Sequence, residues 1–268
     1  MRILLYAGPA PWRDEVIEFS AGMLKYVATS VTLVTGGGTA MLPLLAATVP
    51  RLQLPAAIPI DLRTLPGNAP QAIVQLTEAQ PFDLVILGRL QQPLTRLWRG
   101  QRSKRIAERL EPSVLRVHGA IHPVRRILLT SGGDYHTLDN VAHLATFARP
   151  LAAEVTILHI ISQQSVIFDG FVPSDPHQTF LASDEAEAHV LRAAAARFEH
   201  AHVPAHVRVR VGPVLDEILA ELDEGDYDVL AVGAHRVNST LDRILLEDIT
   251  GDLLDRSPLP VLVVKGAD

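Results

Sequence analysis

Short runs of apolar residues recur along the chain, separated by polar, glycine-rich or proline-rich stretches. The runs are rich in Val, Ile and Leu and lack clean alternation of apolar and polar positions, which is typical of strands buried on both faces of a parallel sheet. In the first half we predict strands at Ile3–Ala7, Val31–Thr35, Ile58–Leu65, Leu84–Gly88 and Val114–Val117. In the second half we predict strands at Arg126–Thr130, Glu154–Ile161, His206–Val211, Val229–Gly233 and Pro260–Val264.

Helical segments are predicted between these strands. The first half has Trp12–Ala28, Ala69–Ala79 and Ser103–Leu110, with a short helical or irregular piece at Met41–Val49. The second half has helices near Asp139–Arg149, Asp184–His202, Pro213–Asp223 and Asp248–Arg256. Pro213 suits a first helical position, where its missing N–H costs nothing. Such alternation predicts doubly wound α/β domains, in which right-handed crossovers gather the loops after the strands at one ligand-binding edge.

The chain repeats itself. Three landmarks return in the same order: Arg2–Leu5 as Arg126–Leu129, Phe82–Gly88 as Tyr227–Gly233, and Ser113–Gly119 as Pro260–Gly266. The offset grows from 124 to 145 between the first two landmarks, so we place about 21 extra residues of the second copy in the loop Ser162–Ala182. The copies join near Gly119–Pro123. We therefore predict two tandem domains, 1–120 and 123–268.

Composition excludes several classes of protein. Of the 268 residues, 48% are hydrophobic and 20% are charged, which is typical of a globular protein with a sizeable core. The net charge of −6 gives no overall basic field, so we expect no nucleic-acid partner. The absence of cysteine excludes disulfides and thiolate metal sites and agrees with a reducing compartment, so we expect a cytoplasmic protein. The N-terminus lacks the features of a signal peptide.

One long stretch without charge, from Tyr26 to Pro50, raises the question of a membrane span. A transmembrane helix needs about 20 mostly apolar residues. This stretch instead contains Gly36–Gly38, Pro43 and several threonines. We interpret it as a buried strand, a turn and a helix of small residues, and expect no membrane partner.

Taken together, several motifs resemble the universal stress protein family. They are the apolar first strand, the Asp-containing strand that ends in Gly88 or Gly233, and the closing Pro258–Val264. The resemblance covers the whole chain twice and is strongest at Gly212–Gly266. It implies Rossmann-like five-stranded parallel sheets with strand order 3-2-1-4-5, in a tandem member similar to a fused dimer. By that likeness, Val114–Val117 and Val261–Val264 would meet and pair the two domains as an internal pseudo-dimer.

The resemblance also implies a test for ATP binding. Binders in the family carry an Asp at the end of strand 1 and a loop G-x2-G-x9-G-[ST] after strand 4, where glycines let backbone N–H groups approach phosphate. In the second copy Gly233 is kept, but Arg236 replaces the second glycine and Ser131 replaces the Asp. Glu247 and Asp248 occupy the motif positions of the third glycine and of the Ser or Thr that follows it. Two carboxylates cap a helix well but repel a triphosphate, so this loop looks like a former nucleotide site.

The first copy departs from the motif differently. Gly88 is kept, Gln91 replaces the second glycine, Gly100 aligns with the third, Gln101 takes the hydroxyl position, and strand 1 ends in Ala7-Gly8. The loop is basic, with Arg89, Arg96, Arg99, Arg102, Lys104 and Arg105, and Ser103 lies within it. It is either an anion site or a solvated charge run, with acidic residues of the other half, such as Glu247 and Asp248, as alternative partners. Trp98 is either a base-stacking or a packing residue.

Other candidates are weighed against plainer interpretations. Thr35–Thr39 is a glycine-rich phosphate cradle or a flexible turn, and Ser131–Asp134 is a ligand loop or a tight turn into the next helix. His235 is a candidate ligand contact. We find no HExxH metal motif, Walker motif or G-x-S-x-G elbow. The candidate cofactor-binding residues are Gly88, Arg89, Arg99, Gly100, Gln101, Ser103, Ser131, Gly132, Gly233 and His235.

These observations favour a stress-response regulatory or binding protein with degenerate ATP-binding motifs. We expect protein partners, a homodimer formed on top of the internal pair, no metal site and no catalytic residues. The alternative is an adenine-nucleotide sensor or weak ATPase that uses the first-half site. A third hypothesis, an enzyme of the wider Rossmann-like nucleotide-hydrolase group, lacks the strand-1 chemistry. The cofactor would be ATP or another adenine nucleotide, or none.

Overall fold

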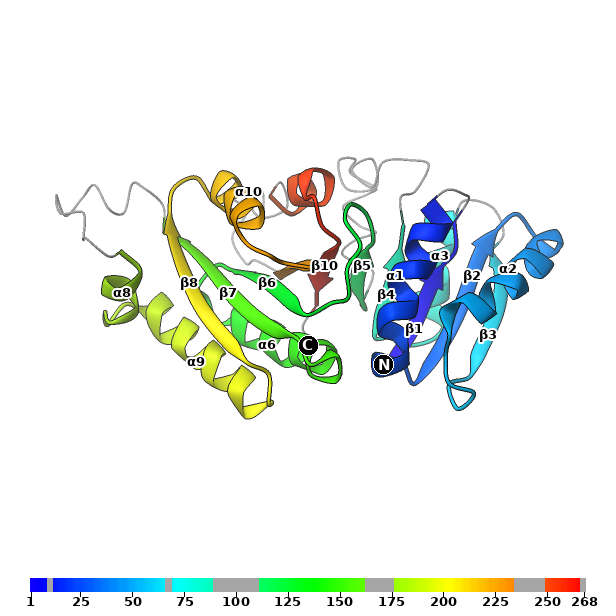
Figure 1. Ribbon diagram of the computed structural model, residues 1–268, viewed down its shortest axis with the longest axis horizontal. Helices are drawn as coiled ribbons and strands as arrows, with labels where there is room; N and C mark the ends of the chain where they lie inside the picture. Colours follow the sequence, from blue (N-terminus) through cyan, green and yellow to red (C-terminus); the bar gives the residue numbers. More distant parts are fainter. Residues whose placement is uncertain (9–11, 66–68, 89–110, 162–175, 234–248, 266–268) are drawn as a thin grey trace. The chain divides into compact units, whose positions relative to one another are not determined.

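The computed structural model describes residues 1–8, 12–65, 69–88, 111–161, 176–233 and 249–265 (Figure 1). The chain divides into two compact units. Unit 1 comprises Met1–Pro123 with Leu259–Leu262, and unit 2 comprises Val124–Pro258 with Val263–Asp268.

Unit 1 is a doubly wound parallel sheet. Its elements are β1 (Arg2–Tyr6), α1 (Trp12–Val27), β2 (Ser30–Gly36), α2 (Leu42–Thr48), β3 (Ile60–Leu65), α3 (Ala69–Ala79), β4 (Leu84–Leu87) and β5 (Ser113–Arg116). Short 3-10 turns, η1 (Thr39–Met41) and η2 (Val49–Leu52), flank α2. The strand order is β3-β2-β1-β4-β5, and the paired strands are parallel, as predicted.

Unit 2 repeats this architecture. Its elements are β6 (Arg126–Ser131), α6 (His136–Ala148), η3 (Arg149–Leu151), β7 (Glu154–Ile161), α8 (Pro176–Leu181), α9 (Ala186–His200), β8 (Ala205–Val211), α10 (Val214–Glu224), β9 (Val229–Gly233), a helix at 249–256 and β10 (Val261–Val264). The order β10-β9-β6-β7-β8 is again that of strands 5-4-1-2-3. The proposed pairing of Val114–Val117 with Val261–Val264 stays a prediction.

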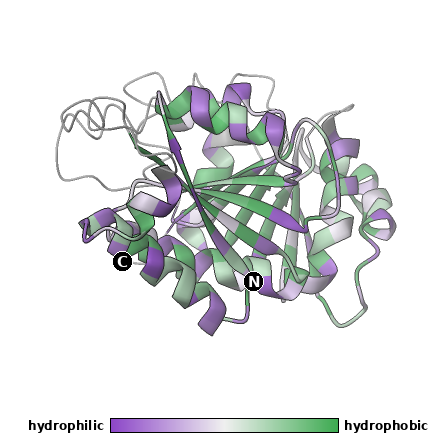
Figure 2. Cartoon of the chain, turned by 60° about the vertical axis from the view of Figure 1, so that its left-hand side comes forward, coloured by the Kyte–Doolittle hydropathy of each residue, from purple (hydrophilic) through white to green (hydrophobic). Residues whose placement is uncertain are grey.

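The strands are buried on both faces, which explains their unbroken apolar sequences. Ile3, Leu4 and Leu5 are all fully buried, although successive side chains of a strand point to opposite faces. On one face of unit 1, Leu4 and Tyr6 belong to a cluster that includes Ile73 of α3. Figure 2 shows the strands in predominantly hydrophobic colours. Burying each such side chain stabilises the fold by roughly 1.5–3 kcal/mol.

Two details differ from the sequence predictions. Pro213 lies one position before the first helical residue of α10, with the extended backbone of an N-cap (φ −67°, ψ 127°). The presumed loop Ser162–Ala182 contains the helix α8, whose polar sequence PHQTFL gave no helical pattern. The helix predicted at Ser103–Leu110 lies outside the described residues.

A repeated aspartate ties the first strand of each sheet to the fourth. In unit 1, Asp83 Oδ2 accepts a hydrogen bond from the backbone N–H of Arg2 at 2.6 Å. In unit 2, Asp228 Oδ2 accepts from the backbone N–H groups of Arg125 and Arg126 at 2.7 and 2.8 Å. Each aspartate also donates its own N–H to the carbonyl of Arg2 or Arg126. The carboxylate thus holds the amino ends of these paired strands together.

We predict that Asp228→Ala lowers the free energy of unfolding by about 2–3 kcal/mol, because it leaves two N–H groups without their charged acceptor. Asp228→Asn retains an acceptor oxygen and should lose roughly half as much. Chemical denaturation measures both, with Asp223→Ala on the exposed surface of α10 as the control. Equal losses in the Asp228 and Asp223 variants would contradict the role of this carboxylate.

In Asp83, burial raises the pKa, but the hydrogen bonds from the side chain and backbone of Arg2 lower it more, so the net shift is downward. A lowered folded-state pKa means that this stabilisation is present above the unfolded value of about 4 and is lost as pH falls below it. We therefore expect Asp83→Asn to reduce the acid dependence of stability below about pH 4. An unchanged slope of unfolding free energy against pH would show that the Arg2 contact contributes nothing.

Candidate functional site

The ligand edge of each unit is where its parallel strands end. In unit 2, β6 ends at Ser131 and β9 ends at Gly233. Because Thr130 lies opposite Val232, Ser131 and Gly233 are brought side by side. In unit 1, Leu5 lies opposite Ile86, which places Ala7 beside Gly88. Gly88 and Gly233 are both buried. In each unit the carboxyl ends of strand 1 and strand 4 therefore lie side by side, as the sequence predicted.

The Ser131–Asp134 turn makes hydrogen bonds to itself. Ser131 Oγ accepts from the Gly133 N–H at 3.1 Å and lies 2.9 Å from Thr137 Oγ1. Asp134 Oδ1 accepts from the Thr137 N–H at 3.3 Å. Gly133 has a φ of 77°, the left-handed conformation that favours glycine. The turn thus leads tightly into α6, and its side-chain hydroxyl already has partners within the protein.

His159 lies beside this turn and was not singled out from the sequence. It stands opposite Ser131 in the β6–β7 register, and its Nδ1–H donates to the Ser131 carbonyl at 3.1 Å. Its ring stacks on Phe180 of α8, with ring centroids 5.2 Å apart and an interplanar angle of 19°. Burial lowers the pKa of His159, outweighing the opposing effects of the Ser131 carbonyl, Glu187 and Glu185. The histidine is therefore held neutral.

Side chains from α8 and α9 cover the ends of β6 and β7. His159 is only 7% exposed beneath Phe180. A Cβ atom added at Gly133 would lie 2.7 Å from Cγ of Glu187 and 3.0 Å from Cε1 of His159. Gly133 is thus required both for its backbone angle and for the packing of Glu187 over it. Glu187 and His159 therefore occupy the space beside Gly133, whereas the predicted site residue Gly132 is exposed and a Cβ added there would meet nothing within 4 Å.

The corresponding edge of unit 1 is built differently. Thr35 occupies the place of His159, because Tyr6 lies opposite Val34 in the β1–β2 register and Ser131 lies opposite His159 in the β6–β7 register. The chain then continues through Gly36–Gly38, and Gly37 and Gly38 are exposed with φ values of 96° and 74°. A Cβ at Gly38 would meet nothing within 4 Å. The glycine-rich turn of unit 1 is therefore open at Gly38.

Tyr6 forms the floor of the unit 1 edge. Its side chain is 6% exposed, and this burial raises its pKa. A Cβ at Gly8 would lie 3.1 Å from Cε1 of Tyr6, and one at Gly36 would lie 4.0 Å from the Tyr6 hydroxyl. Gly8 and Gly36 consequently border the aromatic ring from β1 and β2.

Several candidate residues lie outside the described residues: Arg89, Arg99, Gly100, Gln101, Ser103 and His235, together with Glu247 and Asp248. Their roles stay predictions. Within the described ranges, no group of three or more His, Asp or Glu residues is placed to hold a metal ion. No helix in the described part of the chain combines the length and apolar character needed to cross a bilayer.

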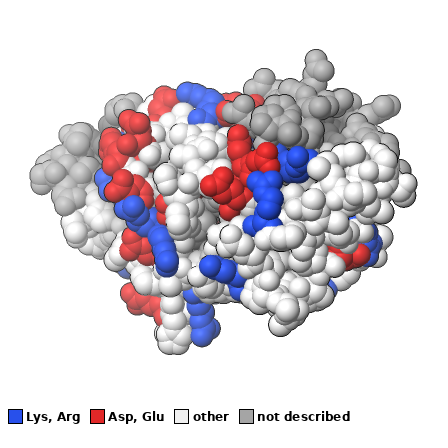
Figure 3. All heavy atoms as spheres, turned by 45° about the vertical axis from the view of Figure 1, so that its right-hand side comes forward, with Lys and Arg blue, Asp and Glu red and all other residues white. Residues whose placement is uncertain are grey.

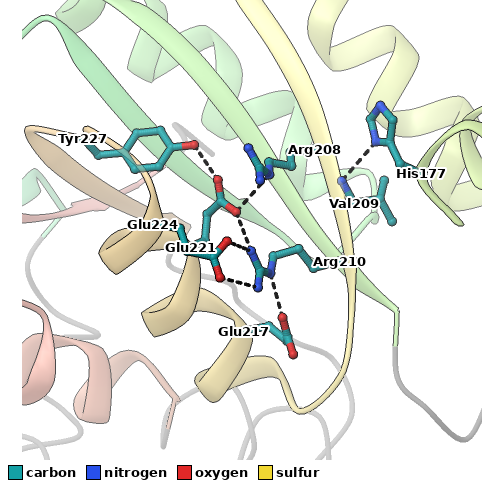
Figure 4. Close-up of polar contacts among 8 residues, drawn as sticks. All are labelled: His177, Arg208, Val209, Arg210, Glu217, Glu221, Glu224 and Tyr227. Carbon is teal, nitrogen blue, oxygen red and sulfur yellow. Dashed lines mark hydrogen bonds and ion pairs between the residues drawn. The ribbon is translucent and has the colours of Figure 1, made fainter. Parts of the chain in front are cut away.

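A charged network on the α10 side of β8 was also missed from the sequence (Figure 4). Arg210 donates to Glu217 at 2.7 Å, to Glu221 at 3.0 Å and to Glu224 at 2.8 Å. Arg208 pairs with Glu221 at 3.0 Å, and the hydroxyl of Tyr227 donates to the same carboxylate at 2.7 Å. Glu221 is 1% exposed, so its charge depends on these donors. The network fastens α10 to the edge strand and is structural.

The edge strand β8 is further protected by α8. The outward N–H of Val209 donates to Nδ1 of His177 at 3.2 Å (Figure 4). Unpaired strand edges invite association with other chains, and a side chain that satisfies an edge N–H blunts this tendency. The insertion in the second copy therefore has two contacts. His177 covers the edge of β8, and Phe180 packs on His159 at the ligand edge.

Comparisons with known proteins agree with this fold. The model of the universal stress protein family matches residues 123–265. A universal stress protein from Archaeoglobus fulgidus is 14% identical with a TM-score of 0.67, covering 99% of this chain and 97% of its own. A putative universal stress protein from Pseudomonas aeruginosa is 15% identical with a TM-score of 0.64, covering 99% and 93%. No curated protein sequence matches the chain.

We predict that Arg210→Ala lowers the free energy of unfolding by about 2 kcal/mol, because the buried Glu221 carboxylate loses one of its cationic partners. Glu224→Ala removes a partner of Arg210 that is 56% exposed and should change stability little. Paired denaturation curves of the two variants measure the difference. Equal effects would mean that the buried carboxylate does not depend on Arg210.

Burial and the hydrogen bond to Glu221 raise the pKa of Tyr227 to about 12. Since the unfolded value is about 10, the stabilisation is complete below about pH 10 and is lost as pH rises towards about 12. Ultraviolet titration of tyrosinate should lose one late-ionising tyrosine in Tyr227→Phe, while Tyr6, whose pKa burial also raises, continues to ionise late. If Tyr227→Phe keeps the same late ionisation as the wild type, the ionisation near pH 12 belongs to another residue.

Proposed function

Because the chain belongs to the universal stress protein family, we propose that it is a regulatory binding protein of the stress response, acting in the cytoplasm through contacts with other proteins. In this proposal unit 2 has lost regular ATP binding and retains the fold as a scaffold. Any adenine nucleotide is bound by unit 1. We assign the protein no catalytic residues.

The observation that carries this proposal is the internally hydrogen-bonded Ser131–Asp134 turn at the ligand edge of unit 2. The Ser131 hydroxyl is engaged with Gly133 and Thr137, so it is not free to meet a ligand. Phe180 and Glu187 lie over the same turn, contacting His159 and the Gly133 backbone region. A nucleotide at this place would have to displace these side chains and break the internal hydrogen bonds.

The sequence of the following loop supports the same conclusion independently. Glu247 and Asp248 stand where ATP-binding relatives are expected to carry a glycine and a hydroxyl residue. Carboxylates at these positions repel phosphate, whereas a phosphate-binding loop needs hydrogen-bond donors there. Loss of the strand-1 Asp to Ser131 removes a third feature of the binding motif.

The second candidate function is adenine-nucleotide sensing by unit 1. It is favoured by the open glycine turn, where Gly37 and Gly38 are exposed and no side chain lies over Gly38. It is also favoured by the basic sequence that follows Gly88, including Arg99 and Arg102. Exposed backbone donors and nearby cations are the two features that an anionic ligand requires.

Thermal unfolding with ATP, ADP, AMP and magnesium tests the two functions. A ligand at a hundredfold excess over Kd stabilises by about 2.7 kcal/mol, which corresponds to roughly 5–10 °C for a domain of about 150 residues. The scaffold function predicts no shift with any nucleotide. A shift that Arg99→Ala/Arg102→Ala abolishes would instead establish unit 1 as a sensor.

The assignment of any site to unit 1 is checked by a matched pair of variants. Ser131→Glu places a charge at the end of β6 in unit 2, and Thr35→Glu places one at the ligand edge of unit 1, beside Ala7, which is the counterpart of Ser131. We expect only Thr35→Glu to alter a nucleotide-dependent shift in melting temperature. A nucleotide response that is lost in Ser131→Glu and kept in Thr35→Glu would place the site in unit 2 and overturn the proposal.

A further inference from the structure

Three histidines surround α8, and each makes a contact that suits its uncharged form. His177 belongs to α8, His159 lies beneath Phe180 of α8, and His189 lies on α9 beside an arginine that binds the end of α8. The helix packs against β8 and α9 (Figure 1). Histidine is the side chain whose charge ordinarily changes between about pH 5 and 8, so the attachment of α8 depends on groups that titrate in this range.

His177 holds α8 to the edge strand as a hydrogen-bond acceptor. Its Nδ1 accepts the backbone N–H of Val209 at 3.2 Å, and Figure 4 shows the ring turned towards that nitrogen. A backbone N–H can only donate, so Nδ1 carries no proton and the ring proton lies on Nε2. In the imidazolium form both ring nitrogens are donors. A proton on Nδ1 therefore sets two N–H groups against each other and breaks this contact.

His189 supports the end of α8 by the same chemistry. Its Nδ1 accepts from Nη2 of Arg192 at 2.9 Å, and Nη1 of Arg192 donates to the carbonyl oxygens of Leu181 and Ser183. A guanidinium has donors only, so this histidine is also unprotonated at Nδ1. Its protonation places two positive charges in contact and weakens the hold of Arg192 on the last residue of α8. Both side chains are exposed, so this repulsion is the weakest of the three effects.

His159 is kept uncharged by its burial under α8. Its Nδ1–H donates to the Ser131 carbonyl, and its ring stacks on Phe180. Burial lowers its pKa and outweighs the opposing effects of Ser131, Glu187 and Glu185. Because the folded-state pKa lies below the unfolded value of about 6.5, the stabilisation is complete above that pH and is lost as pH falls. A charged ring at this place regains water when Phe180 moves off it.

The other charged groups around α8 do not titrate in the same range. Glu185 and Glu187 favour the charged form of the buried histidine and so raise the pH at which it takes up a proton. Arg208 and Arg210 of β8 are bound to carboxylates of α10. Carboxylates, lysines and arginines keep their charges between about pH 5 and 8, and Figure 3 shows such groups side by side on the surface. The remaining carboxylates of the adjoining segments are Asp134, in the turn after β6, and Asp184, between α8 and α9.

We propose that α8 is released from unit 2 when these histidines take up protons, so that mild acid uncovers His159 and the edge of β8. The proposal rests on no nucleotide. The slope of a pH-dependent equilibrium follows the number of protons taken up, so three histidines make the release steeper than one would. Release removes the acceptor of the outward Val209 N–H, and it thereby opens an edge position that the folded insertion protects.

Amide hydrogen exchange of the full chain, expressed as protection factors, tests the proposal. Between about pH 8 and pH 5 we expect the protection of Val209 and of α8 to fall roughly tenfold, while β1 and α1 keep theirs. His177→Asn/His189→Asn keeps an acceptor oxygen near each Nδ1 position but cannot take up protons, so it should lose much less. The matched control is His200→Asn on α9, whose Nδ1 lies 3.3 Å from the Ala196 carbonyl, a contact that protonation preserves. It should respond like the wild type.

NMR of the histidine ring nitrogens gives a second readout that needs no variant. At about pH 8 we expect the proton on Nε2 in His177 and His189 and on Nδ1 in His159. The proposal is overturned if Val209 and α8 stay protected at about pH 5, or if His177 becomes protonated while Val209 remains protected. It is also overturned if β1 loses protection together with α8, which is general unfolding, or if the double variant and His200→Asn respond alike.

Discussion

The hydrogen bonds of Asp83 and Asp228 are the constraint on which the arrangement of both sheets depends. Each carboxylate ties the amino end of the first strand to the start of the fourth, although these segments are far apart in sequence. These bonds hold the amino ends in the register of the β1–β4 and β6–β9 ladders, and that register determines which residues stand together at the opposite, carboxyl edge. Ser131 and Gly233 meet there, as do Ala7 and Gly88. A motif at the amino edge thus positions the candidate site at the carboxyl edge.

The two units share this sheet but differ in the residues that surround their ligand edges. Backbone donors at such an edge must be satisfied by a ligand, by water or by the protein itself. In unit 2 the Ser131 hydroxyl satisfies the Gly133 N–H, and Phe180 and Glu187 pack beside the turn. In unit 1, Thr35 takes the place of His159 and leads into an exposed glycine turn. The insertion that brings α8 into unit 2 is therefore the main physical difference between the copies.

The repeat and the apolar runs were sufficient to predict the strands and most helices, because residues buried on both sides of a sheet must be apolar. The strand order followed from the family resemblance. The contacts around His159 were not predictable in this way. They join β6, β7 and α8, and α8 itself is a six-residue helix of mostly polar sequence. The Arg210 network was equally hidden, since its members look like ordinary surface charges until β8 and α10 bring them together. The place of Ser131 at the end of β6 could be predicted from the motif, but its hydrogen-bond partners could not.

The central claim is that the Ser131 turn of unit 2 satisfies its own Gly133 N–H without a nucleotide. Amide hydrogen exchange at Gly133, followed with and without ATP, tests this most directly. The account predicts a Gly133 amide that is protected in the absence of nucleotide, because it donates to Ser131, and whose protection ATP does not change. Rapid exchange without nucleotide that becomes slow when ATP is added would contradict it, and would show that this edge remains a working site.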